Sequence, residues 1–188
     1  MKSKKSLSEW AQDQDKRSPK LRLAREKAVK AQKGRIKTKP LSKRDFNRLW
    51  GLPEDYKLRW KGHKGLEGVA WYYLSQLRRK EDAKNWGRCI SCPKCLAWNE
   101  GDGGHYVSVS RCAGMKLQED NVYLQSKDCN NPYWTPDASL PFGDEIDRRT
   151  YKGKARELWE QSLHFNDALS EKELLTKIAE WRLRLESL

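Results

Sequence analysis

Five cysteines give this sequence its clearest chemical pattern. The segment Cys89-Ile90-Ser91-Cys92-Pro93-Lys94-Cys95 holds two overlapping C-x2-C pairs, and the later Ser126-Lys127-Asp128-Cys129 has the same spacing with serine in the first position. A C-x2-C turn directs two thiolates at one point, which is half of a zinc knuckle. We therefore predict a structural Zn²⁺ site. The predicted ligands are Cys89, Cys92 and Cys129, with Cys95 or Cys112 as the fourth.

The number of cysteines is odd, and no apolar leader follows the basic N-terminus. An odd count in such a chain argues against a disulfide framework and favours metal binding or free thiols. The alternative is that zinc has been lost and that the cysteines are ordinary small buried residues.

Between the two halves of the knuckle lies the segment Gly101-Asp102-Gly103-Gly104-His105-Tyr106-Val107-Ser108-Val109. The glycines predict a tight turn, and the alternation over residues 106–109 predicts a strand. We therefore expect His105 where a loop becomes a strand. The segments Glu119-Asp120-Asn121 and Cys129-Asn130 follow.

Taken in order, Cys89-x2-Cys92, Trp98, Gly104-His105-Tyr106, Glu119-x-Asn121 and Cys129-Asn130 resemble the central motif of the phage NinG (Rap) recombination proteins. More widely, residues 86–160 resemble the HNH, or ββα-metal, nucleases. The resemblance implies an α+β fold, in which a small zinc-knuckle ββα-metal (HNH-like) centre is flanked by α-helices. It also implies a structure-specific endonuclease that acts on branched DNA recombination intermediates such as Holliday junctions.

Phosphodiester hydrolysis needs a base that activates water and a divalent cation that neutralises charge. In this interpretation His105 is the general base, and Asn130 is a ligand of a catalytic Mg²⁺ or Mn²⁺. Asn121 would brace the loop or orient the imidazole. For His105 alone, the alternative is a structural or surface histidine.

The sequence departs from the HNH pattern at two positions. Gly104 stands where many of these enzymes carry an aspartate that binds the metal, and Ser126 replaces a zinc-binding cysteine. Asp102 is a nearby carboxylate that could substitute for the missing aspartate. The alternative function is therefore a non-catalytic zinc-knuckle protein that binds DNA or RNA through a degenerate HNH site.

The flanking elements are predicted to be helical. We expect a basic helix near residues 19–33, a short helix over 43–50 that starts at Ser42, and an amphipathic helix from Gly65 to about Lys84. A further helix should cover residues 144–165, and a last one should begin at a Ser170…Glu173 capping box. The apolar stripe of this last helix could pack on the domain or pair with a second copy, giving a homodimer.

Positive charge is concentrated at the N-terminus. Residues 1–45 carry sixteen lysines and arginines against five acidic residues, so this segment holds +11 of the net charge of +13. Basic arms of this kind contact phosphate backbones, although binding to an acidic or host protein is an alternative. The predicted nucleic-acid contacts are Lys20, Arg22, Arg25, Lys30, Arg35, Lys37, Arg78, Arg79 and Lys116.

Three regions follow from these patterns. Residues 1–64 form a basic DNA-binding arm, residues 65–165 a helix with the HNH-like zinc-knuckle domain, and residues 166–188 an amphipathic C-terminal helix. The absence of a signal sequence and of any apolar run of about eighteen residues predicts a cytoplasmic protein, in the host cell if phage-encoded, with no membrane partner. No phosphate-binding glycine loop or nucleophile elbow supports nucleotide-driven or acyl-transfer chemistry.

Overall fold

The computed structural model describes residues 41–57, 65–131, 139–165 and 168–188. The chain divides into two compact units, Met1–Tyr56 and Lys57–Leu188. In the first unit, α3 (Lys43–Leu49) begins after Ser42, whose hydroxyl accepts a hydrogen bond from the backbone N–H of Asp45. This confirms the predicted short helix and its cap. The helix predicted near residues 19–33 lies outside the described residues.

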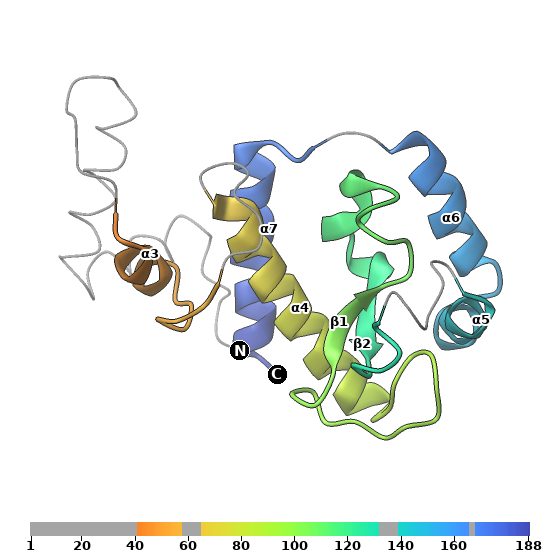
Figure 1. The fold of residues 1–188 in the computed structure, drawn as a ribbon. Coiled ribbons are helices and arrows are strands. Elements are labelled where there is room, and N and C mark those ends of the chain that lie inside the picture. The colour runs from red at the N-terminus through yellow and green to blue at the C-terminus, as the bar shows by residue number, and fades with distance from the viewer. Residues whose placement is uncertain (1–40, 58–64, 132–138, 166–167) are drawn as a thin grey trace, which may run out of the picture. The chain divides into compact units, whose positions relative to one another are not determined.

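The second unit is an α+β fold with a two-stranded antiparallel sheet. In Figure 1, β1 and β2 lie between α4 on one side and α5 and α6 on the other, and α7 runs beside α4. The elements are α4 (Leu66–Asn85), β1 (Asp102–His105), the 3-10 helices η2 (Ala113–Leu117) and η3 (Glu119–Asn121), β2 (Val122–Gln125), α5 (Leu140–Arg149), α6 (Lys154–His164) and α7 (Glu171–Glu186).

Helix α4 confirms the predicted amphipathic helix and forms the centre of the core. Val69, Leu74 and Leu77 have no exposed surface. On its far side lies α7, which begins with the predicted Ser170–Glu173 capping box. Among the described residues, no helix combines the length and the apolar character needed to cross a membrane.

The apolar stripe of α7 packs within the chain. Leu174 and Trp181 are fully buried, whereas the neighbouring Leu175 is 41% exposed. The indole Nε1 of Trp181 donates to Glu119 Oε1 at 2.7 Å, and Arg184 bridges Glu119 and Glu81. Of the two roles predicted for this stripe, packing on the domain is therefore the one present in the structure.

The predicted strand is displaced along the sequence. The strand is Asp102–His105, not residues 106–109, and the glycines lie in the strand rather than in a turn. It pairs with β2 so that Gly103 lies opposite Leu124 and His105 opposite Val122. A Cβ at Gly103 would come within 2.8 Å of Ser75 Oγ on α4. The strand thus approaches the helix too closely for a side chain at that position, which alternation of apolar residues does not reveal.

The helix predicted over residues 144–165 is two helices, α5 and α6, so this prediction was wrong. Gly153 has φ = 98°, a left-handed conformation that ends the continuous helix. The Asp147 carboxylate accepts hydrogen bonds from the backbone N–H groups of Gly153 (2.7 Å) and Ala155 (2.8 Å). The start of α5 lies at Leu140, because Pro141 is tolerated in the first helical turn.

Candidate metal centre

The loop after α4 folds into a small knuckle. Gly87, with φ = 61°, starts the loop, and the Cys89 backbone N–H donates to the Lys94 carbonyl at 2.9 Å. The Ile90 N–H then donates to the Leu124 carbonyl of β2, also at 2.9 Å. The knuckle is therefore hydrogen-bonded both to itself and to the sheet. This arrangement brings the first two cysteines toward the turn that follows β2.

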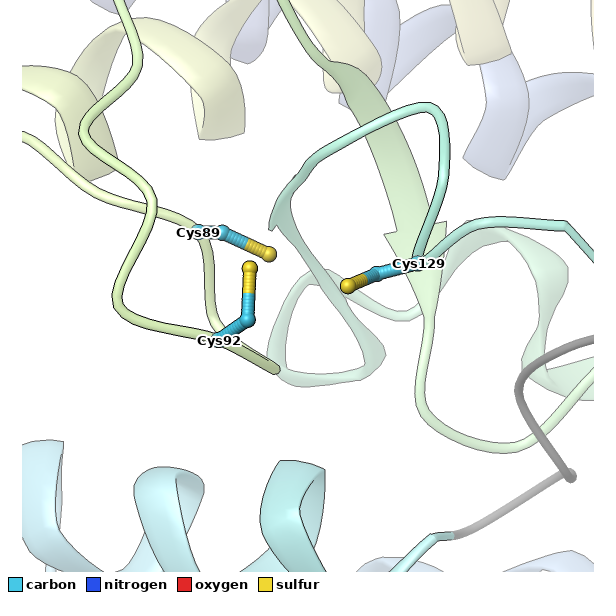
Figure 2. Close-up of side chains that lie close together, drawn as sticks. All are labelled: Cys89, Cys92 and Cys129. Carbon is cyan, nitrogen blue, oxygen red and sulfur yellow. The ribbon is translucent and has the colours of Figure 1, made fainter.

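Three cysteines converge at this point, and Figure 2 shows their side chains directed at one another. The Sγ atoms of Cys89, Cys92 and Cys129 all lie within 4.8 Å of one another. In a tetrahedral zinc site with Zn–S bonds of about 2.3 Å, the sulfurs are about 3.8 Å apart, so only a small contraction is needed. The three thiols can therefore hold a metal ion such as zinc.

The surroundings of the cluster act differently on its cysteines. Cys89 Sγ accepts hydrogen bonds from the backbone N–H groups of Ser91 (3.3 Å) and Ser126 (3.2 Å). Burial acts against ionisation of Cys92, but hydrogen bonds from the Lys94 backbone and from neighbouring side chains hold the pKa of its thiol below the usual value. Burial raises the pKa of Cys129 to about 11. The Cys92 thiol therefore ionises more readily than usual, and a bound divalent cation would replace the proton on the Cys129 sulfur.

The other two cysteines lie elsewhere. Cys95 is exposed, and it pairs through its backbone with Arg88 at the base of the knuckle. Cys112 is buried in the core between the sheet and α5–α6, where its thiol donates to the Phe165 carbonyl at 3.0 Å. Neither belongs to the cluster of three sulfurs. The structure therefore does not bring the two predicted candidates for the fourth ligand to the metal centre.

A second polar group lies beside the cluster. The side-chain amide of Asn130 donates to the Asp102 carboxylate at 3.3 Å. Gln125, opposite Asp102 in the register, donates to Ser91 Oγ of the knuckle at 2.8 Å. Because side chains alternate along a strand, these groups share one face of the hairpin. We call the face that carries Asp102 and Gln125 the knuckle face. It carries the Asp102 carboxylate and, hydrogen-bonded to it, the side chain of Asn130, the two residues predicted to bind Mg²⁺ or Mn²⁺.

His105 lies on the opposite face, which we call the helix face because it packs on α4. Its ring stacks on Trp71 with centroids 4.6 Å apart and an interplanar angle of 16°. Nε2 lies 3.0 Å from the Lys116 carbonyl oxygen, so Nε2 carries the proton and donates it. Burial lowers the pKa of the imidazole, although the bond to Lys116 opposes this shift. At neutral pH the ring is therefore uncharged, and Nδ1 is its proton acceptor.

Asn121 holds the segment that follows β1. It is completely buried. Its carbonyl oxygen accepts from the Val107 N–H at 2.8 Å, and its amide donates to the carbonyls of Val107 (2.9 Å) and Met115 (3.0 Å). These bonds correspond to the loop-bracing role among the two that were predicted. The Asn121 side chain does not contact the Asp102–Asn130 pair, which lies on the exposed side of the hairpin.

The predicted nucleic-acid contacts that fall within the described residues are occupied by the protein itself. Arg78 donates to the Val122 carbonyl and pairs with Glu81. Arg79 donates to the carbonyls of Trp98 and Gly101. Lys116 pairs with Glu67 at 2.5 Å in a largely buried position. Predicted contacts Lys20, Arg22, Arg25, Lys30, Arg35 and Lys37 lie outside the described residues.

Two residues contribute to the site that sequence patterns did not assign to it. Asp82 of α4 is buried, and its carboxylate accepts from the Leu124 N–H at 2.7 Å, which fixes β2 against the helix. Trp71 of α4 covers the His105 ring. An acidic residue late in an otherwise amphipathic helix was the available signal for Asp82. No sequence signal linked Trp71 to His105, because their contact depends on the tertiary fold.

No protein-family model, curated protein or solved structure matches this chain.

Proposed function

We propose that the protein is a metal-dependent DNA endonuclease of HNH type whose site is supported by a structural Zn²⁺ in the cysteine cluster. The observation that carries the proposal is the Asp102–Asn130 contact of 3.3 Å directly beside that cluster. A carboxylate and an amide oxygen are ligands that Mg²⁺ and Mn²⁺ accept. Asn130 immediately follows the cluster residue Cys129, so zinc binding would fix the position of the amide.

Asp102 can replace the aspartate that the HNH pattern has at position 104. Residues 102 and 104 point to the same face of β1, because they are two apart on a strand. A Cβ at Gly104 would lie only 2.0 Å from Gln125 Oε1, so this position has no space for a carboxylate while Gln125 binds the knuckle. Asp102 can therefore supply a carboxylate to the same face from one strand repeat earlier.

In this proposal Asp102 and Asn130 would hold the divalent cation, which would supply an activated water and neutralise charge on the leaving oxygen. On the strength of the resemblance, and not of its position on the helix face, His105 is proposed as the general base. Its available nitrogen is Nδ1, since Nε2 is held by the Lys116 carbonyl. The preferred substrate is a branched duplex, on the strength of the resemblance described above, and the basic residues of the N-terminal arm would bind its phosphates.

The test is nicking of a four-way junction, a flap and a linear duplex in Mg²⁺, Mn²⁺ or EDTA. We expect metal-dependent nicking that Asn130→Ala and Asp102→Ala abolish, and that His105→Ala reduces by about 10²–10⁴-fold. Asp128→Asn is the matched control, because its carboxylate lies on the same turn as Asn130 and is 85% exposed. DNA affinity and zinc content should stay unchanged in the variants. Normal cleavage by Asn130→Ala and Asp102→Ala would refute the metal assignment.

The second candidate function is that of a zinc-knuckle protein that binds DNA or RNA without cutting it. The placement of His105 favours it, because the ring stacks on Trp71 on the helix face while Asp102 occupies the knuckle face. In the same assay this function predicts a salt-sensitive gel shift of the junction with no nicking in either metal. Metal-dependent nicking excludes it.

A further inference from the structure

A tetrahedral metal site has four ligand positions, and the three thiols fill three of them. Ser126 lies at the fourth position, which we call the fourth corner of the cluster. Ser126 is 1% exposed and hydrogen-bonds with two of the three cysteines. Its backbone N–H donates to Cys89 Sγ at 3.2 Å, and its hydroxyl accepts from the Cys129 N–H at 3.2 Å. The Ser126 side chain also helps to lower the pKa of the Cys92 thiol. A buried hydroxyl thus lies beside the three sulfurs.

The turn that carries Ser126 also carries Asn130. The Asn130 backbone N–H donates to the Ser126 carbonyl at 2.8 Å. The fourth corner of the cluster is therefore one helical turn from the amide proposed to bind the catalytic cation. A change in charge at that corner acts on Asn130 and on any phosphate bound beside it.

The ligand at the fourth corner determines the net charge of the metal site. Four thiolates around Zn²⁺ give a net charge of −2, whereas three thiolates and a neutral oxygen give −1. Oxygen is also a weaker partner for zinc than thiolate sulfur, and it exchanges with solvent more readily. A centre of the second kind repels a DNA phosphate less but holds its metal less tightly.

We propose that the metal centre is a three-thiolate site, in which Cys89, Cys92 and Cys129 bind Zn²⁺ and a neutral oxygen held at Ser126 completes the tetrahedron. The oxygen is that of the Ser126 hydroxyl or of a water bonded to it. The inference rests on the zinc site of the proposed function. It makes Ser126 a metal-site residue, not a lost ligand, and it excludes Cys95 and Cys112 as the fourth ligand.

The experiment is cobalt substitution of the purified full-length protein. The intensity of the thiolate-to-cobalt charge-transfer band grows with the number of thiolates bound to the metal. Wild type should therefore give the intensity expected for three thiolates. Ser126→Cys should raise it by about one third, and Cys129→Ser should lower it by about one third. Cys95→Ser and Cys112→Ser are matched controls and should leave it unchanged.

Zinc competition against a chromophoric chelator gives the second readout. Ser126→Cys should tighten zinc binding on the order of a hundredfold, because one strong ligand of four is gained. Ser126→Ala should weaken binding, since nothing then holds the oxygen. Unchanged affinity in Ser126→Ala, or a loss of one thiolate in Cys95→Ser, would overturn the inference. If wild type binds neither cobalt nor zinc, the zinc site of the proposed function is overturned. If wild type binds cobalt with the spectrum of four thiolates, only the present inference is overturned.

Discussion

The β1–β2 hairpin and the cysteine knuckle beside it are supported by different kinds of interaction. On the helix face, the hairpin packs on α4, where Val69, Leu74 and Leu77 are completely buried. Burying an aliphatic side chain of this size contributes about 1.5–3 kcal/mol, so this side is stable through packing alone. Among the described residues, the buried cluster of the knuckle has only three members: Cys89, Leu96 and Leu124. The knuckle itself therefore needs a cross-link that its apolar residues do not provide.

The residues suited to chemistry are divided between these two regions. The polar groups that could bind a catalytic cation, Asp102 and Asn130, contact each other beside the knuckle, which has few buried apolar residues of its own. His105 lies on the well-packed side, neutral and stacked on Trp71. A metal in the cysteine cluster would order the first group without affecting the second. The four predictions below change one side at a time.

We expect the largest effect on the free energy of unfolding from Trp181→Ala, which removes a buried side chain from the α4–α7 side of the molecule. Trp181 is fully buried between α7 and the core, and its indole donates to Glu119. Its loss leaves a large cavity, and we expect the free energy of unfolding to fall by about 3–5 kcal/mol. Chemical denaturation followed by circular dichroism measures this. Leu175→Ala, on the exposed side of the same helix, should change it by less than about 0.5 kcal/mol.

Removing zinc should act on the other side alone. With free zinc at a thousandfold excess over its Kd, chelation removes about 4 kcal/mol of linked stability. Hydrogen–deuterium exchange should accelerate at residues 88–96 and 124–130, while α4 and α7 keep their protection. Exchange that accelerates equally in all elements would contradict the separation of the two sides.

Asn121→Ala breaks the connection between η2 and the segment after β1. The substitution leaves the buried Val107 N–H and the Met115 carbonyl without their partners. We expect a loss of about 2–3 kcal/mol, because each buried unsatisfied group costs about 1–3 kcal/mol. Asn99→Ala, on an exposed residue of the knuckle loop, is the control. An equal effect of the two substitutions in thermal denaturation would refute this role of Asn121.

The smallest effect concerns pH and the contact between α5 and the start of the knuckle. A hydrogen bond from Arg148 lowers the pKa of Glu145 to about 2, against the effect of burial and with further help from Arg149 and Arg88. A lowered carboxyl pKa means that the stabilisation is complete above the ordinary value of 4.5 and is lost as the pH falls toward 2. Glu145→Gln should flatten the dependence of the melting temperature on pH in this window.

The control for that experiment is Glu160→Gln. Glu160 pairs with Arg156 on α6, and both side chains are more than half exposed. Exposed pairs of this kind contribute little, so the pH dependence of this variant should match that of wild type. A wild-type pH profile in Glu145→Gln would show that the carboxylate does not hold α5 to the knuckle.

Local patterns predicted the helices well where capping and periodicity agree. Ser42 before α3, the apolar repeat of α4 and the Ser170–Glu173 box before α7 are interactions within a few residues, and each is present in the structure. The strand was misplaced and the helix over 144–165 was predicted as continuous for the same reason. Gly103 lies in a strand because α4 passes within contact distance, and residues 150–153 break the helix because the Asp147 carboxylate caps the next one.

For the candidate site, the C-x2-C spacing by itself predicted that two thiols of the segment Cys89–Cys95 lie together, but the overlapping pairs Cys89–Cys92 and Cys92–Cys95 share that spacing. The Cys129-Asn130 pair likewise fixed the amide beside a cysteine. Only the tertiary structure decided that Cys129 joins the cluster while Cys95 and Cys112 do not, that Asp102 contacts Asn130, and that His105 lies on the other face of the hairpin. These depend on the pairing of β1 with β2 and on their packing against α4, which are contacts between residues far apart in the chain.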